Sequence, residues 1–247
     1  MKKTLLAVLL GSFALASFAQ PIMIEKQGAF SAGGTVIEAK KTFDPYHPEP
    51  DAMTLHGDHA NIIYQIPAHA KDVSLMFLHG AGQSMRTWQT TPDGREGFQS
   101  VFLRKGYPVY LIDQPRRGDA GRATVDGTIK ASPDEQFWFG QFRMGLWPKF
   151  YDNSAFASQK DLNSFWRQMT PNTAPYNDKV IADAVTDALK KTKDTVLVTH
   201  SQGCGPGWLI GTEAGKNLKG IIAFEPGSGF IFPEGKVPAP IPNNSFF

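Results

Sequence analysis

Residues 195–203 read TVLVTHSQG, and this stretch decides the fold. The apolar run at 195–198 predicts a strand buried on both faces, as central parallel strands are when helices cover both sides of a sheet. Ser201 follows it, with Gly203 two positions later, and a helix is expected to begin there. A sharp strand-to-helix turn exposes a serine hydroxyl at the sheet edge and needs small residues two positions to either side. Thr199 stands where glycine is usual, so the turn alone is equally compatible with a serine that caps a helix.

The rest of the chain alternates between strands and helices in the same way. Further buried strands are predicted at the apolar runs 73–78, 108–112 and 220–224. Helical spacing of apolar residues is found at 97–105 and 177–189. Shorter strands, joined by a loop, are expected at 35–39 and 61–65. This alternation predicts an α/β protein with a mostly parallel sheet and helices on both faces.

Residues 116–175 interrupt the alternation, and we expect them to form a cap inserted into the domain. Ten aromatic residues lie from Phe137 to Trp166, a much higher density than the 12% of the whole chain. Such side chains either line an apolar pocket for an acyl or aromatic group or form the cap's own core. We expect a core role for most of Phe137, Trp138, Phe139, Phe142, Trp147 and Phe150. Outside the cap, Trp88 is the better candidate for a substrate contact.

Three loops carry polar residues at the carboxyl ends of the predicted strands, the edge where α/β sheets bind ligands. They begin at His79, Ser201 and Glu225. A serine needs a base and two N–H donors that stabilise the developing oxyanion, and the backbone N–H groups of Ala81 and Gln202 are the expected donors. Glu225 is either the acid that orients a catalytic histidine or a solvated carboxylate at a strand end, and we expect the former. His79 is expected to be structural.

Short motifs from several parts of the chain resemble one family. They are His79-Gly80, Thr87-Trp88, 90–95, 102–107, Ile112-Asp113-Gln114, Arg117-Gly118, 200–203 and 224–227. In these motifs the chain resembles the α/β-hydrolase family, and most closely a small group of secreted bacterial esterases, over about residues 35–230. The resemblance implies Ser201 as nucleophile and Glu225 as the triad acid after the sixth strand. It also implies hydrolysis of carboxylic esters through an acyl-enzyme, without metal or organic cofactor.

The base is the missing member of this set. The family's histidine follows the last strand, whereas His47, His56, His59, His69, His79 and His200 all precede Glu225. His200 adjoins Ser201 but should point away, because consecutive side chains of a strand face opposite sides. We therefore expect a truncated or naturally shortened hydrolase that lacks the last strands. Loss of a triad member leaves only ~10³–10⁴-fold catalysis over water, so feeble hydrolysis is expected. The alternative is a non-catalytic ligand-binding or remnant protein on the same fold.

The ends and the composition suggest where the protein works. Residues 1–19 predict a secretory signal peptide, with Lys2 and Lys3 before an apolar run. Residues 20–247 would then be the hydrolase domain, incomplete at its carboxyl end, in a periplasmic or secreted protein. The formal charge of +2 is too balanced for nucleic acid, and no later segment predicts a membrane span. The expected partner is a small-molecule ester, and no feature indicates an oligomeric state.

The single cysteine, Cys204, excludes an internal disulfide and is expected to be buried.

Overall fold

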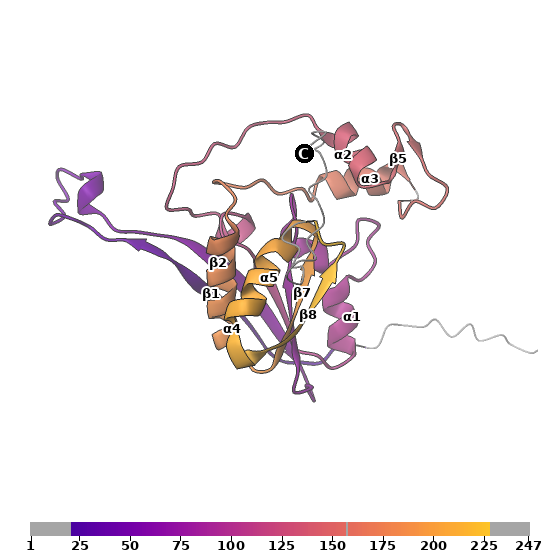
Figure 1. Cartoon of the computed structure of the whole chain (residues 1–247), viewed down its shortest axis with the longest axis horizontal. Helices are drawn as coiled ribbons and strands as arrows, with labels where there is room; N and C mark the ends of the chain where they lie inside the picture. Colours follow the sequence, from indigo (N-terminus) through magenta and orange to yellow (C-terminus); the bar gives the residue numbers. More distant parts are fainter. Residues whose placement is uncertain (1–20, 157, 228–247) are drawn as a thin grey trace, which may run out of the picture.

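The computed structural model describes residues 21–156 and 158–227, and its centre is a six-stranded sheet (Figure 1). The strand order is β1-β2-β4-β3-β7-β8, in which β2 pairs antiparallel with β1 and β4 and the other neighbours are parallel. The strands are β1 Ile24–Ile37, β2 Leu55–Pro67, β3 Ser74–Leu78, β4 Val109–Asp113, β7 Thr195–His200 and β8 Leu218–Phe224. The expected mostly parallel α/β sheet is confirmed. The predicted signal peptide lies outside the described residues.

Helices cover both faces of this sheet, as expected. One face packs against α4 (Asp178–Lys190) and α5 (Cys204–Glu213), and the other against α1 (Phe98–Arg104) (Figure 1). Successive side chains of β3 alternate between the two cores, because side chains of a strand point to opposite faces in turn. Met76 and Leu78 lie in the core with α4, and Leu75 and Phe77 in the core with α1. Five short 3-10 helices lie in the connections between these elements. They are η1 Pro50–Ala52, η2 Met85–Trp88, η3 Gly118–Ala120, η4 Ser201–Gly203 and η5 Gly215–Asn217.

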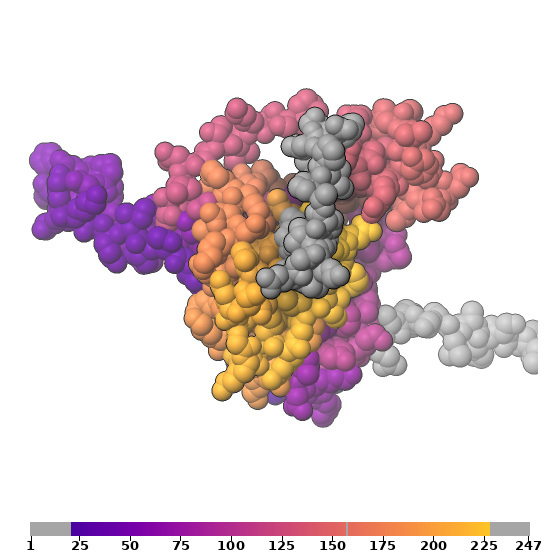
Figure 2. Space-filling view, viewed as in Figure 1, coloured from indigo at the N-terminus to yellow at the C-terminus, as the bar shows by residue number. Residues whose placement is uncertain are grey.

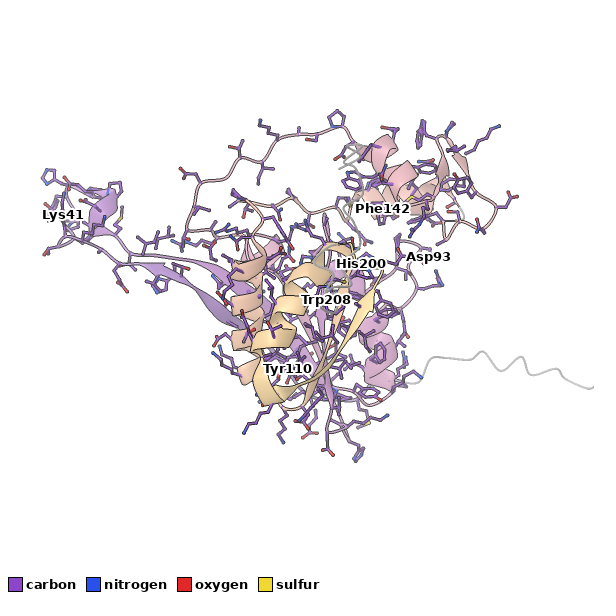
Figure 3. All side chains as sticks on the ribbon, in the orientation of Figure 1. Lys41, Asp93, Tyr110, Phe142, His200 and Trp208 are labelled. Atoms are coloured by element: carbon purple, nitrogen blue, oxygen red, sulfur yellow. The ribbon has the colours of Figure 1, made fainter. Side chains whose placement is uncertain are left out.

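The first two strands are much longer than the sequence predicts. Their paired register runs to Ile37 and Leu55, so β1 and β2 extend beyond the sheet as an arm whose tip is residues 38–54 (Figure 1). Figure 3 marks Lys41 in this tip. Most β1 side chains are exposed. Because little of β1 is buried, it lacks the apolar alternation by which a strand is recognised, and only its last residues were predicted.

The prediction of a buried strand at 220–224 is wrong about burial. β8 forms there, but it is the last strand in the order, and among the described strands only β7 pairs with it. Ile222 and Phe224 are 46% and 41% exposed. The apolar composition therefore identified a strand correctly but not its position at the side of the sheet.

The cap between β4 and α4 contributes no described strand to the main sheet. It contains α2 (Glu135–Gln141), the small pair β5 (Gly145–Leu146) and β6 (Lys149–Phe150), and α3 (Gln159–Trp166). The space-filling view shows these segments gathered above the sheet domain (Figure 2). Their core is built on Phe139, Met144, Leu162 and Trp166, with Trp138 and Phe150 packed against it.

The expected core role is therefore confirmed for three of the six cap aromatics. Trp138, Phe139 and Phe150 belong to this core, whereas Phe137, Phe142 and Trp147 are 46%, 39% and 48% exposed. The suggested role of Trp88 as a substrate contact is not supported. Its side chain is only 6% exposed and packs against Phe77 and Phe98 on the α1 face of the sheet.

Candidate active site

Ser201 lies at a strained turn between β7 and α5. Its φ angle is +52°, in the left-handed region that non-glycine residues rarely adopt. The turn also needs a glycine two residues later, because a Cβ on Gly203 would come within 2.4 Å of the His79 carbonyl oxygen. This is the strand–turn–helix geometry that the stretch 195–203 predicts.

Glycine is usual at position 199, but Thr199 fits there because the residue of α5 that packs against it, Gly207, has no side chain. Thr199 is fully buried, and a Cβ on Gly207 of α5 would lie 2.9 Å from the Thr199 methyl carbon. The Thr199 Oγ1 lies 3.1 Å from the Cys204 Sγ, so its hydroxyl has a buried partner. Cys204 is a free, fully buried thiol whose pKa is raised by burial, which confirms its expected packing role.

The loop after β3 packs directly against this turn. A Cβ on Gly80 would lie 2.9 Å from the Ser201 Cβ and 2.9 Å from the His200 carbonyl oxygen, so only glycine allows the approach. Ala81 is the next residue and is half-buried. On the other side of the serine, the carbonyl of Gln202 accepts a hydrogen bond from the Tyr176 hydroxyl at 3.3 Å. Gly80 thus packs against Ser201, Ala81 follows Gly80 in the chain, and Gln202 follows Ser201.

The segment after β8 is the third loop at this edge. The Gly227 N–H donates to the Ser201 carbonyl at 3.1 Å, and a Cβ on Gly227 would lie 3.3 Å from the Ser201 Oγ. Glu225, two residues earlier, has a φ of +43°. Its carboxylate accepts from Arg143 of the cap at 2.7 Å, and both side chains are largely exposed. The structure therefore brings together the three loops, while the Glu225 carboxylate itself contacts the cap.

His79 is held neutral inside the protein. The Gln114 N–H donates to His79 Nε2 at 3.4 Å, so the proton resides on Nδ1, which donates to the Gly80 carbonyl at 3.1 Å. Burial and the nearby Arg117 charge lower the pKa of His79 to about 3. Asp113 lies 3.7 Å from Nε2, and its carboxylate accepts from two backbone N–H groups, those of Met85 and Asp119. These contacts give His79 a structural role, as expected.

His200 is also committed to other contacts. Its Nδ1 donates to the Gln83 Oε1 at 2.9 Å, and its ring meets the edge of Trp88. Burial lowers its pKa. Figure 3 labels His200 at the end of the sheet that faces the cap. All six histidines belong to the described part of the chain, and none of them is hydrogen-bonded to the Ser201 hydroxyl.

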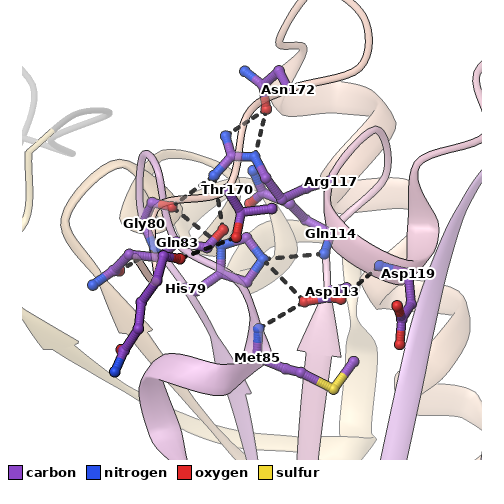
Figure 4. Close-up of polar contacts among 11 residues, drawn as sticks. His79, Gly80, Gln83, Met85, Asp113, Gln114, Arg117, Asp119, Thr170 and Asn172 are labelled. Carbon is purple, nitrogen blue, oxygen red and sulfur yellow. Dashed lines mark hydrogen bonds and ion pairs between the residues drawn. The ribbon is translucent and has the colours of Figure 1, made fainter. Parts of the chain in front are cut away.

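The sequence did not reveal the residues that fix the loop after β3. Gln83 accepts from the Gly80 N–H at 2.9 Å, and Arg117 donates to the Gly80 and Gln83 carbonyls and to Asn172 (Figure 4). The sequence shows Arg117 only as part of the Arg117-Gly118 motif, because no sequence pattern indicates that an arginine in a loop will be buried.

Other kinds of site are not evident in the described residues. No group of three or more His, Cys, Asp or Glu side chains within 21–156 and 158–227 could hold a metal ion. None of the helices described there is long and apolar enough to cross a bilayer. A groove of about 800 Å³ runs between the 84–94 loop and the end of α3, and Ser201 does not line it.

Comparisons with known proteins identify the family of the chain. The profile of the alpha/beta hydrolase family matches residues 75–246. A probable secreted lipase, phiG, of a fungal species (strain ATCC 74256) is 32% identical over 161 residues, which are 62% of this chain and 44% of that lipase. This chain thus spans less than half the length of that curated relative. A solved structure titled as a novel bacterial esterase is 27% identical with a TM-score of 0.70, and the match covers 82% of this chain and 68% of that one. The family match spans well over half of the chain and includes the turn at Ser201, so the chain belongs to the alpha/beta hydrolase family.

Proposed function

We propose that the protein hydrolyses carboxylic esters through an acyl-enzyme on Ser201. The observation that supports this most strongly is the strained φ of +52° at Ser201, at a turn that both Gly80 and Gly227 approach closely. Strain of this kind persists only where the surrounding structure enforces it, and it is typical of functional positions. The names of the similar lipase and esterase are consistent with ester substrates.

The proposed chemistry follows the usual course of acyl transfer. The Ser201 Oγ attacks the ester carbonyl carbon, and the negative charge that develops on the carbonyl oxygen is stabilised by the N–H groups of Ala81 and Gln202. The bond to the alkoxy group then breaks, the alcohol leaves with a proton, and the acyl group remains on Ser201. Water attacks the acyl carbon in the second step and releases the acid.

Glu225 is the proposed acid of the triad. It follows β8 and precedes Gly227, whose N–H donates to the Ser201 carbonyl. A carboxylate there would orient an imidazole and stabilise its charged form. Because none of the six histidines contacts the Ser201 hydroxyl, we propose slow hydrolysis by the 247-residue chain itself.

We also propose that the protein is exported to the periplasm or beyond the cell and acts on a small-molecule ester. The apolar segment after Lys2 and Lys3 supports export, as does the name of the secreted lipase. Secretion of a fusion of residues 1–25 to a reporter enzyme tests this. Retention of the reporter in the cytoplasm would contradict it.

A fluorophosphonate probe tests the nucleophile, because it forms a covalent bond to activated serines. We expect slow labelling of the protein and its loss in Ser201→Ala. Ser164→Ala is the matched control, since Ser164 lies in the cap helix α3 and its hydroxyl donates to the Lys160 carbonyl of the same helix. Undiminished labelling and ester hydrolysis in Ser201→Ala would refute Ser201 as the nucleophile. A folded parent protein that neither labels nor hydrolyses esters would refute the proposal and favour a non-catalytic binding protein.

A further inference from the structure

Arg117 is buried in an unusual way. Its side chain is among the largest fully buried ones, with 2% of the residue exposed. Within residues 21–156 and 158–227, no carboxylate forms an ion pair with it. Buried arginines normally have a charged partner, because the desolvation of an unpaired cation is costly. The neighbouring Arg116 follows this rule, since it makes a two-pronged ion pair with Asp58.

The partners of Arg117 are instead neutral oxygens of two distant segments. Its Nη1 donates to the Gln83 carbonyl at 2.9 Å and to the Gly80 carbonyl at 3.2 Å. On the other side of the guanidinium, Nε donates to the Asn172 Oδ1 at 2.7 Å, and Nη2 donates to the same oxygen. Figure 4 shows the guanidinium between the loop after β3 and Asn172, which lies near the end of the cap.

The Gly80 carbonyl belongs to the same peptide group as the Ala81 N–H. In a planar trans peptide the C=O and N–H bonds point in opposite directions. Three donors hold this carbonyl oxygen, namely Arg117 Nη1 at 3.2 Å, His79 Nδ1 at 3.1 Å and the Gln83 N–H at 3.3 Å. They therefore fix the direction of the Ala81 N–H, and Gly80 packs against the Cβ of Ser201.

Other polar groups on either side of Ala81 are also hydrogen-bonded. The Gly80 N–H donates to the Gln83 side chain at 2.9 Å, and the Gly82 carbonyl accepts from the Thr170 N–H at 2.8 Å. Among the described residues, no group accepts a hydrogen bond from the Ala81 N–H. The network thus holds the backbone on both sides of Ala81 and leaves the Ala81 N–H available as a donor.

We propose that Arg117 is a positioning residue that aims the Ala81 N–H at the oxyanion of the proposed reaction and, through Asn172, links that donor to the cap. This inference rests on the proposed ester hydrolysis at Ser201. Although burial lowers the pKa of Arg117 to about 10, the guanidinium stays charged at neutral pH. A cation bonded to the Gly80 carbonyl also polarises the peptide, which makes its N–H a stronger donor.

The test compares Arg117→Lys with Arg116→Lys on the purified chain, using a p-nitrophenyl ester and the matching thionoester. The ammonium of lysine is a compact group, so it should not reach the Gly80 and Gln83 carbonyls and the Asn172 Oδ1 at once, as the wider guanidinium does. Arg116 is the matched control because it is the adjacent buried arginine, and it contacts Asp58 and the Pro175 carbonyl rather than the loop after β3.

We expect Arg117→Lys to lower kcat for the ester by about 10–100-fold with KM within about threefold, below the ~10²–10³-fold loss on removal of a whole oxyanion donor. The thionoester should be affected much less, because sulfur accepts hydrogen bonds poorly and gains little from the donor. The ester-to-thionoester ratio of kcat should therefore fall in Arg117→Lys and stay unchanged in Arg116→Lys.

An unchanged ratio in a folded Arg117→Lys protein would overturn the inference, as would an equal fall in Arg116→Lys. If Arg117→Lys does not fold, the same ratio is measured in Asn172→Ala. This variant keeps the guanidinium and removes the Asn172 Oδ1, the acceptor of its Nε and Nη2. A ratio in Asn172→Ala equal to that of the parent protein would also overturn it. Failure of the proposed function has a different signature, since hydrolysis would then be unchanged in Ser201→Ala.

Discussion

Gly203 and the carbonyl oxygen of His79 are so close that the two loops can meet only without a side chain at Gly203. A Cβ there would lie 2.4 Å from the oxygen, which is backbone and cannot rotate away. This contact joins the end of β3 to the turn at Ser201. The parallel pairing of β3 with β7 places both strand ends at the same edge.

Gly203→Ala should therefore lower the free energy of unfolding by about 1–3 kcal/mol or more, as overpacking of a tight site does. The measurement is urea unfolding followed by circular dichroism. Gly140→Ala is the control, because Gly140 lies within α2 and a Cβ there would meet no atom within 4 Å. Alanine is favoured over glycine inside helices by about 1 kcal/mol, so this variant should be neutral or more stable. Equal stability of the two variants would contradict the expected clash.

With imidazole added as the base, Glu225→Gln should lower kcat by up to about tenfold, because its charge would stabilise the imidazolium as in other triads. The fold should be retained, because the carboxylate is largely exposed and its ion pair with Arg143 is of the surface kind that contributes little. Arg143→Gln is the matched control, since it breaks the same ion pair and keeps the acid. The rates are measured with imidazole added, as described below. Loss of kcat in Arg143→Gln alone would assign the effect to the cap rather than to Glu225.

The main sheet and the position of the three loops could be predicted from the sequence, and much of the surroundings could not. Ser201, Ala81 and Glu225 each follow a strand, and parallel strands bring their carboxyl ends to one edge of a sheet. The sequence does not predict the length of β1, because most of its side chains are exposed. The alternation of apolar and polar residues marks a strand only where one face is buried. Arg117 was missed for another reason. Its partners are 34 to 55 residues away, and no local pattern records such contacts.

His79 predicts a dependence of stability on pH. Its pKa is about 3 in the folded protein and 6.5 in the reference state, so the unfolded chain binds more protons between these values. The contribution of a neutral His79 is complete above pH 6.5 and is lost as the pH falls toward 3. The limiting slope for one group is about 1.4 kcal/mol per pH unit. Asp113 acts in the opposite sense, because burial raises its pKa.

This dependence can be measured by urea unfolding of the parent protein and of His79→Asn between pH 4 and pH 7. Asparagine can donate to the Gly80 carbonyl in place of Nδ1 and does not titrate. The stability of His79→Asn should therefore fall less steeply as the pH is lowered. His56→Asn, at an exposed position of β2, is the control and should keep the parent slope. Parallel curves for the parent and His79→Asn would show that His79 is not the buried neutral group described above.

Imidazole added to the solution should accelerate hydrolysis at Ser201. No hydrogen bond joins His79 or His200 to the Ser201 hydroxyl in this structure, so neither is placed to take its proton. A small base that reaches the hydroxyl would supply the general-base step, which typically contributes about 10²–10⁴-fold. Free imidazole is not positioned, so we expect a smaller gain, of about tenfold at high concentration. The measurement is the rate of p-nitrophenyl acetate hydrolysis against imidazole concentration, with Ser201→Ala subtracted because imidazole also cleaves this ester in water. A Ser201-dependent rate that does not rise with imidazole would mean that removal of the Ser201 proton is not what limits hydrolysis.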